Sequence, residues 1–218
     1  MAYSAGFHPH PKISYVGAAP TGVGSEAEYL EIALAKPCDP EQVRAAIDAV
    51  LPDGLDILRA VDVVDCLPGS LAEQIQGSCW QLELVADPVE LAAAVQLLLA
   101  ADSVLVERLT KDGTRSLDAR APIVSALVSA AIPGSGSIAG TGSVSAPDSG
   151  AQRAIMTVVV RQVTPTVRPD DVLTALRSVA GFAPSEPARA TRLAQGPVDV
   201  VGVVGDPLRR HELSSTNS

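Results

Sequence analysis

The chain has 218 residues, of which 47% are hydrophobic and only 3% aromatic, so its core must consist mainly of Ala, Val, Leu and Ile. The net charge of −9 argues against a protein that binds nucleic acid through one broad basic face, but a local basic patch is compatible with this charge. The sequence shows neither an uncharged apolar stretch of membrane-spanning length nor a signal peptide, and we expect a cytoplasmic protein.

The first third of the chain predicts three strands and one helix. Strand patterns cover 13–19, 26–34 and 55–64, where β-branched or alternating apolar residues stand between turns rich in Gly and Pro. Asp39-Pro40 predicts the start of a helix, because Asp caps a helix N-terminus and Pro is favoured in the first turn. Residues 67–77 are interpreted as a linker.

The remainder repeats this pattern with a full set of elements. Strands are expected over 80–85, 103–110, 115–119, 123–131, 154–163 and 191–194, and helices from Asp87-Pro88 to about Ala100 and over 170–180. Removing one extra strand leaves the split βαβ order of a ferredoxin-like fold. We therefore predict an α+β protein with two ferredoxin-like domains. Residues 1–66 form the first, which is N-terminally incomplete, and residues 78–205 form the second.

Two segments are predicted to lack fixed structure. Residues 133–150 are rich in Gly and Ser and predict a flexible loop, while the polar residues 206–218 predict a disordered tail. The glycines of the loop do not stand between a strand and a helix, and no GKS or GKT follows them, so a phosphate-binding loop is not indicated.

The three cysteines are widely spaced and odd in number, which predicts reduced and mostly buried thiols: Cys38, Cys66 and Cys79. Without a CxxC pair, neither an iron–sulfur cluster nor a structural zinc site is indicated, and we predict no cofactor. Trp80 is interpreted as a core residue. The acidic run that contains Glu26 and Glu28 is most simply a solvated strand face.

The segment His8-Pro9-His10-Pro11-Lys12 allows several interpretations. In an extended chain His8 and His10 lie on one side, roughly 6–7 Å apart, but a metal site needs three or four ligands and no local partner is evident. The alternating prolines favour a stiff entry into strand 13–19. Acid–base catalysis by His10 and anion binding by the histidines, Lys12 and the turn at 22–24 stay open as alternatives.

Residues 2–34 resemble the domain of unknown function found in radical SAM-linked proteins. That family carries a run like YSxGFxPHPxISF, then a Pro-x-Gly turn, then SEAEYLD, and this chain has YSAGFHPHPKISY, Pro20-Thr21-Gly22 and SEAEYLE at these places. The family segment follows a strand and an arginine-rich helix. The resemblance therefore implies that Met1 aligns with an internal position and that the natural start lies upstream, or that the chain is truncated.

The resemblance also implies a role beside cobalamin-binding radical SAM enzymes. We expect a non-catalytic accessory or substrate-presenting protein that works with such an enzyme, with RNA as one substrate to consider. An enzyme in its own right, with His10 and Lys12 at the active site, and a structural scaffold are the alternatives. The residues predicted to contact an anion or a partner are His8, His10, Lys12, Ser14, Gly22 and Glu26.

Overall fold

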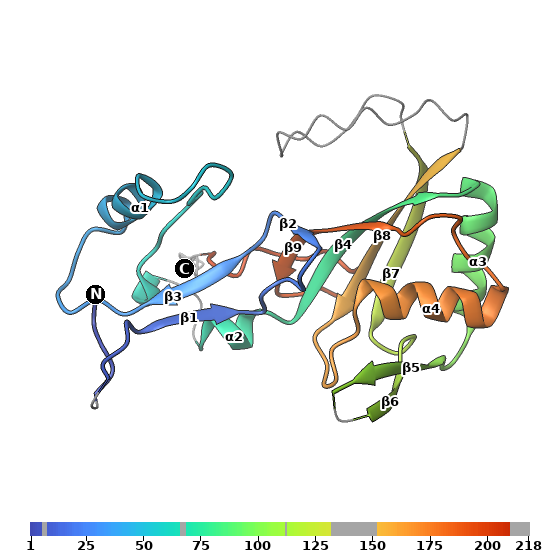
Figure 1. Ribbon diagram of the computed structural model, residues 1–218, viewed down its shortest axis with the longest axis horizontal. Coiled ribbons are helices and arrows are strands. Elements are labelled where there is room, and N and C mark those ends of the chain that lie inside the picture. Colours follow the sequence, from blue (N-terminus) through green and yellow to red (C-terminus); the bar gives the residue numbers. More distant parts are fainter. Residues whose placement is uncertain (6–7, 66–68, 112, 132–151, 210–218) are drawn as a thin grey trace, which may run out of the picture.

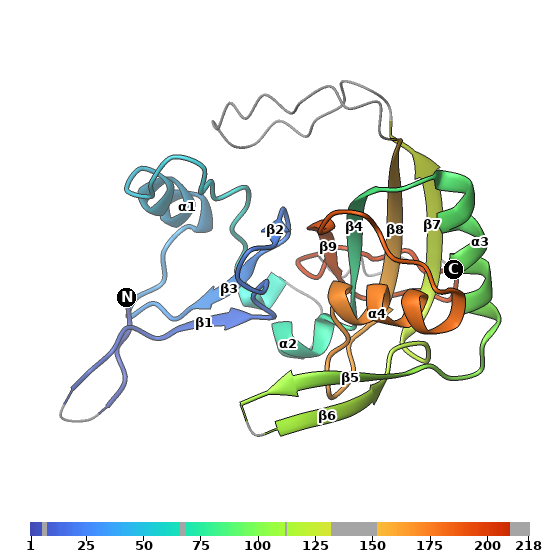
Figure 2. The ribbon, with the colours of Figure 1, turned by 45° about the vertical axis from the view of Figure 1, so that its right-hand side comes forward.

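The computed structural model describes residues 1–5, 8–65, 69–111, 113–131 and 152–209, and the predicted loop 133–150 lies outside them. In both views the N-terminal elements lie on one side of β2, and a sheet with two helices lies on the other (Figures 1 and 2). The elements of the first part are β1 (Ile13–Val16), β2 (Gly24–Ser25), β3 (Tyr29–Ile32), α1 (Pro40–Asp48), a 3₁₀ helix (Val63–Asp65) and α2 (Leu71–Gln74). Those of the second part are β4 (Gly77–Val85), α3 (Pro88–Ala100), β5 (Leu105–Thr110), β6 (Gly113–Asp118), β7 (Ile123–Ala130), β8 (Arg153–Arg161), α4 (Pro169–Ala180) and β9 (Arg189–Gly196).

The main sheet has five strands in the order β2-β9-β4-β8-β7. Neighbouring strands from β9 to β7 run antiparallel, and the two residues of β2 join the edge parallel to β9. Among the described residues, the chain order β4-α3-β7-β8-α4-β9 is interrupted only by the β5–β6 hairpin, which forms a separate two-stranded sheet. This mixture of antiparallel sheets and helices agrees with the predicted α+β class.

The core lies between the main sheet, α3 and α4. Alternate residues of β4, such as Leu82 and Leu84, face the same side as Met156 of β8 and pack with Leu91 of α3 and Leu176 of α4. All five are at most 2% exposed. Trp80 joins this cluster, which confirms the prediction that it is a core residue.

The Asp-Pro pairs start helices as predicted. Asp39 accepts a hydrogen bond from the backbone N–H of Gln42, and Asp87 accepts one from that of Val89, so each caps the helix that follows. Gly181 ends α4 with a φ of 65°, in the left-handed region that glycine tolerates best.

The N-terminal region consists mainly of an antiparallel ribbon. β1 pairs with β3, and a bridge between Tyr3 and Pro11 extends the pairing toward the N-terminus. We call residues 2–4, 10–16 and 29–33 the N-terminal ribbon. The described part of residues 1–66 therefore contains this ribbon and α1, while β2 belongs to the main sheet rather than to a sheet of its own.

Several expectations were wrong. The segment 55–64 is not a strand: it is irregular up to the 3₁₀ helix at Val63–Asp65, and none of the strands in the described residues pairs with it. Instead, Ile57 is held to α1 by Asp48 and Arg44. The linker 67–77 includes the capped helix α2 and the first residue of β4.

The start of the predicted disordered tail is also fixed in place. Asp206 forms an ion pair with Arg59 at 2.6 Å, and Pro207 is buried. The backbone just before Asp206 packs closely against Gly196. A Cβ at Gly196 would lie 2.1 Å from the carbonyl oxygen of Gly205, so a larger residue would not fit there. Among the cysteines, Cys38 is exposed and Cys79 half-buried, so the expectation of mostly buried thiols was wrong for Cys38.

Candidate functional site

The N-terminal region joins the main sheet through a buried arginine on β9. The guanidinium of Arg192 donates hydrogen bonds to the carbonyl oxygen of Gly17 at 2.5 Å, to Ser25 Oγ at 3.2 Å and to Glu28 Oε1 at 2.5 Å. Its carbon Cζ lies 5.4 Å from the centroid of the Trp80 ring, which suits a cation–π contact. Ser25 and Glu28 belong to the SEAEYLE run, so this part of the motif anchors the N-terminal region to β9.

A second buried polar side chain of β9 supports the same junction. Gln195 is 1% exposed, and its Nε2 donates to the carbonyl oxygen of Ala27 at 2.6 Å. Since that carbonyl can only accept, it determines the orientation of the amide and leaves Oε1 turned away from it. Oε1 is buried without a donor among the described residues.

A bulge brings Arg192 and Gln195 to one face of the sheet. In a regular strand, residues three apart point to opposite faces. Here the register shifts between Cys79 and Trp80, so that Trp80 lies opposite Arg192 and Ser78 lies opposite Gln195. The additional residue in β9 is Leu193, and such bulges redirect side chains. Both polar side chains therefore face the helix-covered side of the sheet.

Glu28 is charged at neutral pH in this setting. Partial burial by itself would raise its pKa, but hydrogen bonds from Ser25 and Arg192, the charge of Arg192 and the backbone N–H of Ala19 together lower the pKa below its ordinary value of 4.5. The carboxylate thus holds both Arg192 and the segment that follows β1.

A cavity of about 240 Å³ lies beside this junction. It is bounded by the segment Gly17–Pro20 and by the ends of β4, β8 and β9 that lie near the start of α4. Three arginines line it, Arg161, Arg168 and Arg192, and its lining includes neither Asp nor Glu. In a chain with a net charge of −9, this local excess of positive charge makes the cavity suited to an anion.

The histidine–proline motif lies elsewhere, at the end of the N-terminal ribbon. The side chains of His8, His10 and Lys12 are exposed, and none of them lines the cavity. Backbone hydrogen bonds shape the motif: Ser4 N–H donates to the carbonyl of His10 at 2.8 Å, and Lys12 N–H to that of Ala2 at 2.9 Å. Ser4 Oγ also accepts from His10 N–H at 3.0 Å.

The other predicted site residues are spread along the N-terminal region. Ser14 is exposed in β1 opposite Glu31, and Gly22 lies in a turn with a φ of 85°. Glu26 is exposed, and its backbone N–H donates to the carbonyl of Arg192 at 2.9 Å. The structure therefore places only Glu26 next to the junction, and there through its backbone.

Among the residues that the structure describes, no cluster of three or more His, Cys, Asp or Glu is placed to hold a metal ion. Burial raises the pKa of the Cys79 thiol, which disfavours the reactive thiolate. The helices described are all too short or too polar to span a bilayer.

A family model matches residues 1–169, a range that includes the N-terminal ribbon, Glu28 and Arg168. The family is described as an uncharacterized protein conserved in bacteria (DUF2344). The chain belongs to this family. Among curated proteins and solved structures, none is similar enough to the chain to count as a match. Arg192 and Gln195 of the junction lie beyond the matched range.

Sequence reasoning identified the motifs at residues 3–15 and 25–30 but missed all three cavity arginines. From the sequence alone, no role was assigned to Arg161, Arg168 or Arg192. The detectable signal was modest: Arg192 and Gln195 are long polar residues in the interior of a strand whose other interior residues are small or apolar, and burial of a charge there requires a partner.

Proposed function

We propose that this chain is a non-catalytic accessory protein that docks onto a cobalamin-dependent radical SAM enzyme and presents an RNA substrate to it. The observation that carries the proposal is an exposed apolar face on the N-terminal ribbon. The kind of partner enzyme comes from the family resemblance of residues 2–34, and the anionic substrate from the arginine-lined cavity beside the ribbon.

The apolar face follows from the pairing of β1 and β3. Ile13 lies opposite Ile32 and Tyr15 lies opposite Leu30, so these four side chains share one side of the ribbon. Tyr15 is 69% exposed, Ile13 41% and Leu30 38%. We call these four residues the docking face. Contiguous exposed apolar patches mark interaction surfaces, and tyrosine is enriched in protein interfaces.

The surroundings of the docking face indicate the chemistry of the partner. The adjoining end of the ribbon carries His8, His10 and Lys12, all exposed, in a protein that is acidic as a whole. A complementary partner surface is therefore apolar at its centre and acidic at its rim, since matched charges fix register and reject wrong partners. The predicted anion or partner contacts of this motif are thus assigned to the interface.

We further propose that residues 77–196 are a ferredoxin-like unit with a β-hairpin inserted. The strand order β9-β4-β8-β7 and the chain order strand–helix–strand–strand–helix–strand support this assignment, because they correspond to the split βαβ arrangement. The N-terminal ribbon is then an attachment to its β9 edge. An enzyme with His10 and Lys12 at its active site finds less support, because the cavity includes neither residue.

The docking proposal is tested by size-exclusion chromatography and calorimetry with a co-expressed cobalamin-dependent radical SAM enzyme from the same genome. Tyr15→Ser should weaken association at least tenfold, about 1.4 kcal/mol, because it removes a large side chain from the centre of the face. Leu127→Ser is the matched control: Leu127 is 71% exposed, but on β7 at the opposite edge of the main sheet.

Two results would contradict the proposal. The first is that the wild-type chain does not associate with the enzyme. The second is that Leu127→Ser weakens association as much as Tyr15→Ser. This would indicate nonspecific association through exposed apolar side chains rather than binding through a defined face.

A further inference from the structure

The cavity between Gly17–Pro20 and the main sheet carries two arginines that the fold leaves unused. Arg161 is the last residue of β8, and Arg168 directly precedes α4; both are exposed. Neither guanidinium forms an ion pair or hydrogen bond with another described residue. By contrast, Arg44, Arg59, Arg108 and Arg192 each contact a carboxylate.

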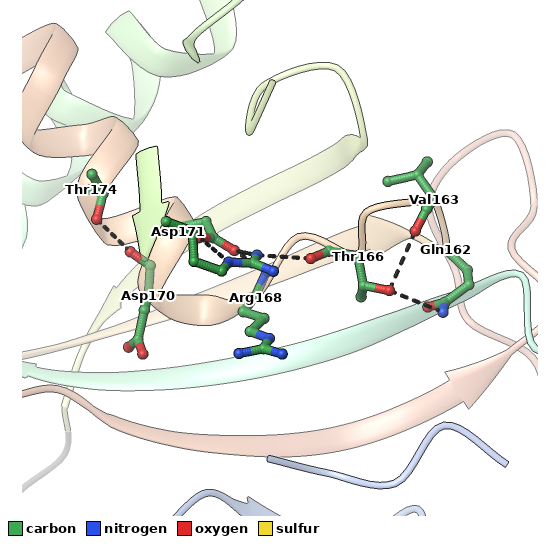
Figure 3. Close-up of polar contacts among 8 residues, drawn as sticks. Gln162, Val163, Thr166, Arg168, Asp170, Asp171 and Thr174 are labelled. Carbon is green, nitrogen blue, oxygen red and sulfur yellow. Dashed lines mark hydrogen bonds and ion pairs between the residues drawn. The ribbon is translucent and has the colours of Figure 1, made fainter. Parts of the chain in front are cut away.

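Figure 3 shows how the start of α4 keeps Arg168 available. The carboxylate of Asp171 accepts from the backbone N–H of Arg168 at 2.7 Å and forms an ion pair with Arg108, so its charge is already balanced. The guanidinium of Arg168 extends away from the carboxylate of Asp171, and no dashed line meets it. The N-terminal end of a twelve-residue helix adds a favourable field for an anion at this place.

The interior of the cavity is different in character from its rim. Trp80, Val160 and Val167 provide buried apolar walls, and the guanidinium of Arg192 lies over Trp80 with its charge paired to Glu28. Gln195 contributes a buried oxygen that lacks a donor, and Gly17 packs against that oxygen, since a Cβ on Gly17 would lie 2.8 Å from it. A ligand that bears an N–H or O–H group can satisfy the oxygen when Gly17 shifts.

These features define a ligand with a charged end and an uncharged end. Two free guanidinium groups match the oxygens of a phosphate, which can accept paired N–H donors from both of them. The volume of about 240 Å³ is below the roughly 300 Å³ at which pockets begin to enclose a whole drug-sized ligand. The cavity can therefore enclose the base or the sugar of one nucleotide, with the phosphate on the exposed arginines, but not a duplex. Apolar walls with one buried acceptor suit a nucleobase or sugar behind the phosphate.

We propose that this cavity binds one phosphorylated nucleotide of the RNA substrate, with its phosphate on Arg161 and Arg168 and its nucleoside toward Trp80 and Gln195. That the nucleotide belongs to an RNA substrate rests on the proposed function. That the cavity is a binding site rests on its own residues. It assigns the anion to the cavity instead of to the histidine–proline motif.

Fluorescence of Trp80 provides a direct measurement, because it is the only tryptophan of the chain and lines the cavity. The full-length protein is titrated with inorganic phosphate, adenosine 5′-monophosphate and a 5′-phosphorylated tetra-adenylate. We expect saturable changes in emission with the two nucleotide probes, binding of each at least tenfold tighter than that of phosphate, and weaker binding at high salt.

Arginine variants locate the phosphate. Arg161→Gln and Arg168→Gln should each weaken binding of adenosine 5′-monophosphate about tenfold, which corresponds to about 1.4 kcal/mol. Arg153→Gln is the matched control, since Arg153 is an exposed arginine at the other end of the same strand and does not line the cavity. All three positions are exposed, so the variants should fold, and circular dichroism checks this.

Each remaining outcome decides a part of the proposal. Equal affinities of the three arginine variants would overturn the cavity as the site, and equal affinities for phosphate and nucleotide would overturn the nucleotide. Tighter binding of the tetra-adenylate supports RNA as the source, whereas binding of the mononucleotide alone would overturn RNA in favour of a free nucleotide. The titrations are repeated with Tyr15→Ser. If this variant loses enzyme docking but still binds nucleotide, docking and the nucleotide site are independent. A failure of the docking proposal then leaves the nucleotide site standing, and the reverse also holds.

Discussion

Residues 77–196 and residues 1–65 use their apolar side chains in opposite ways. The first of these regions buries them in one cluster between the main sheet, α3 and α4. In the second, Ala27 is the sole buried hydrophobic residue among those described, and α1 buries none of its side chains. The sheet region therefore has a core that stabilises it independently, whereas the N-terminal region obtains its conformation from backbone pairing and from its anchor on Arg192.

This contrast explains why an apolar docking face can persist in a folded protein. A side chain that already packs in a core is not free to contact a partner, while Tyr15 and Ile13 of the ribbon are held in position by β1–β3 pairing and stay exposed. The junction at Arg192, Glu28 and Gln195 then connects the docking face to the cavity. Under our two proposals, the docking face and the ligand cavity are therefore connected through this one polar cluster.

The largest expected effect comes from comparing the two regions by core truncation. Leu176→Ala should lower the free energy of unfolding by about 2–5 kcal/mol, because Leu176 is fully buried between α4 and the sheet. Ile47→Ala in α1 should cost about 0.5 kcal/mol or less, as expected for a position outside the core. Denaturant unfolding measures both. Similar losses would show that α1 contributes to a shared core and that the contrast between the regions is wrong.

The next largest effect concerns the anchor itself. Arg192→Leu removes all three hydrogen bonds to Gly17, Ser25 and Glu28. We expect tryptic cleavage after Lys12, which precedes Ile13, to become at least tenfold faster, because local opening of the N-terminal region costs less free energy, while residues 77–196 stay resistant. Arg161→Gln, an exposed arginine outside the junction, serves as the control. An unchanged cleavage rate in Arg192→Leu would mean that the ribbon is held by other contacts.

A smaller effect is the pH dependence of the anchor. The pKa of Glu28 is lowered in the folded protein, so its stabilising contribution is complete above pH 4.5, the ordinary value for the unfolded chain. The contribution is lost as the pH falls through the lowered pKa, where the folded carboxylate becomes protonated. The difference in free energy of unfolding between wild type and Glu28→Gln should therefore be constant from pH 7 to about pH 5 and shrink at lower pH. A difference that does not shrink below pH 4.5 would contradict the assignment.

Much of the fold could be predicted from local sequence patterns, and the site could not. Helix starts at Asp39-Pro40 and Asp87-Pro88 depend only on adjacent residues, so they were predicted correctly. Segment 55–64 has strand-like composition, but a strand also needs a partner, and pairing is a long-range property. The cavity requires still more distant information. Arg161, Arg168 and Arg192 come together only through the sheet order and the bulge at Leu193, which no local pattern indicates.

The smallest effect on stability, and the sharpest distinction within the ribbon, concerns the histidine–proline motif. His10→Ala and Lys12→Ala should each change the free energy of unfolding by about 0.5 kcal/mol or less, because their side chains are exposed and the pairing of this segment uses backbone groups. Ser4→Ala should cost more, about 0.5–1.5 kcal/mol, since Ser4 Oγ accepts the His10 N–H. If the two exposed cations contact the acidic rim of the partner enzyme, the same variants should weaken docking at low salt and do so less at high salt, where screening already suppresses the contact. A stability loss above 1 kcal/mol in His10→Ala or Lys12→Ala would instead identify the motif as a structural element of the ribbon, and docking would then depend on Tyr15 and its apolar neighbours alone.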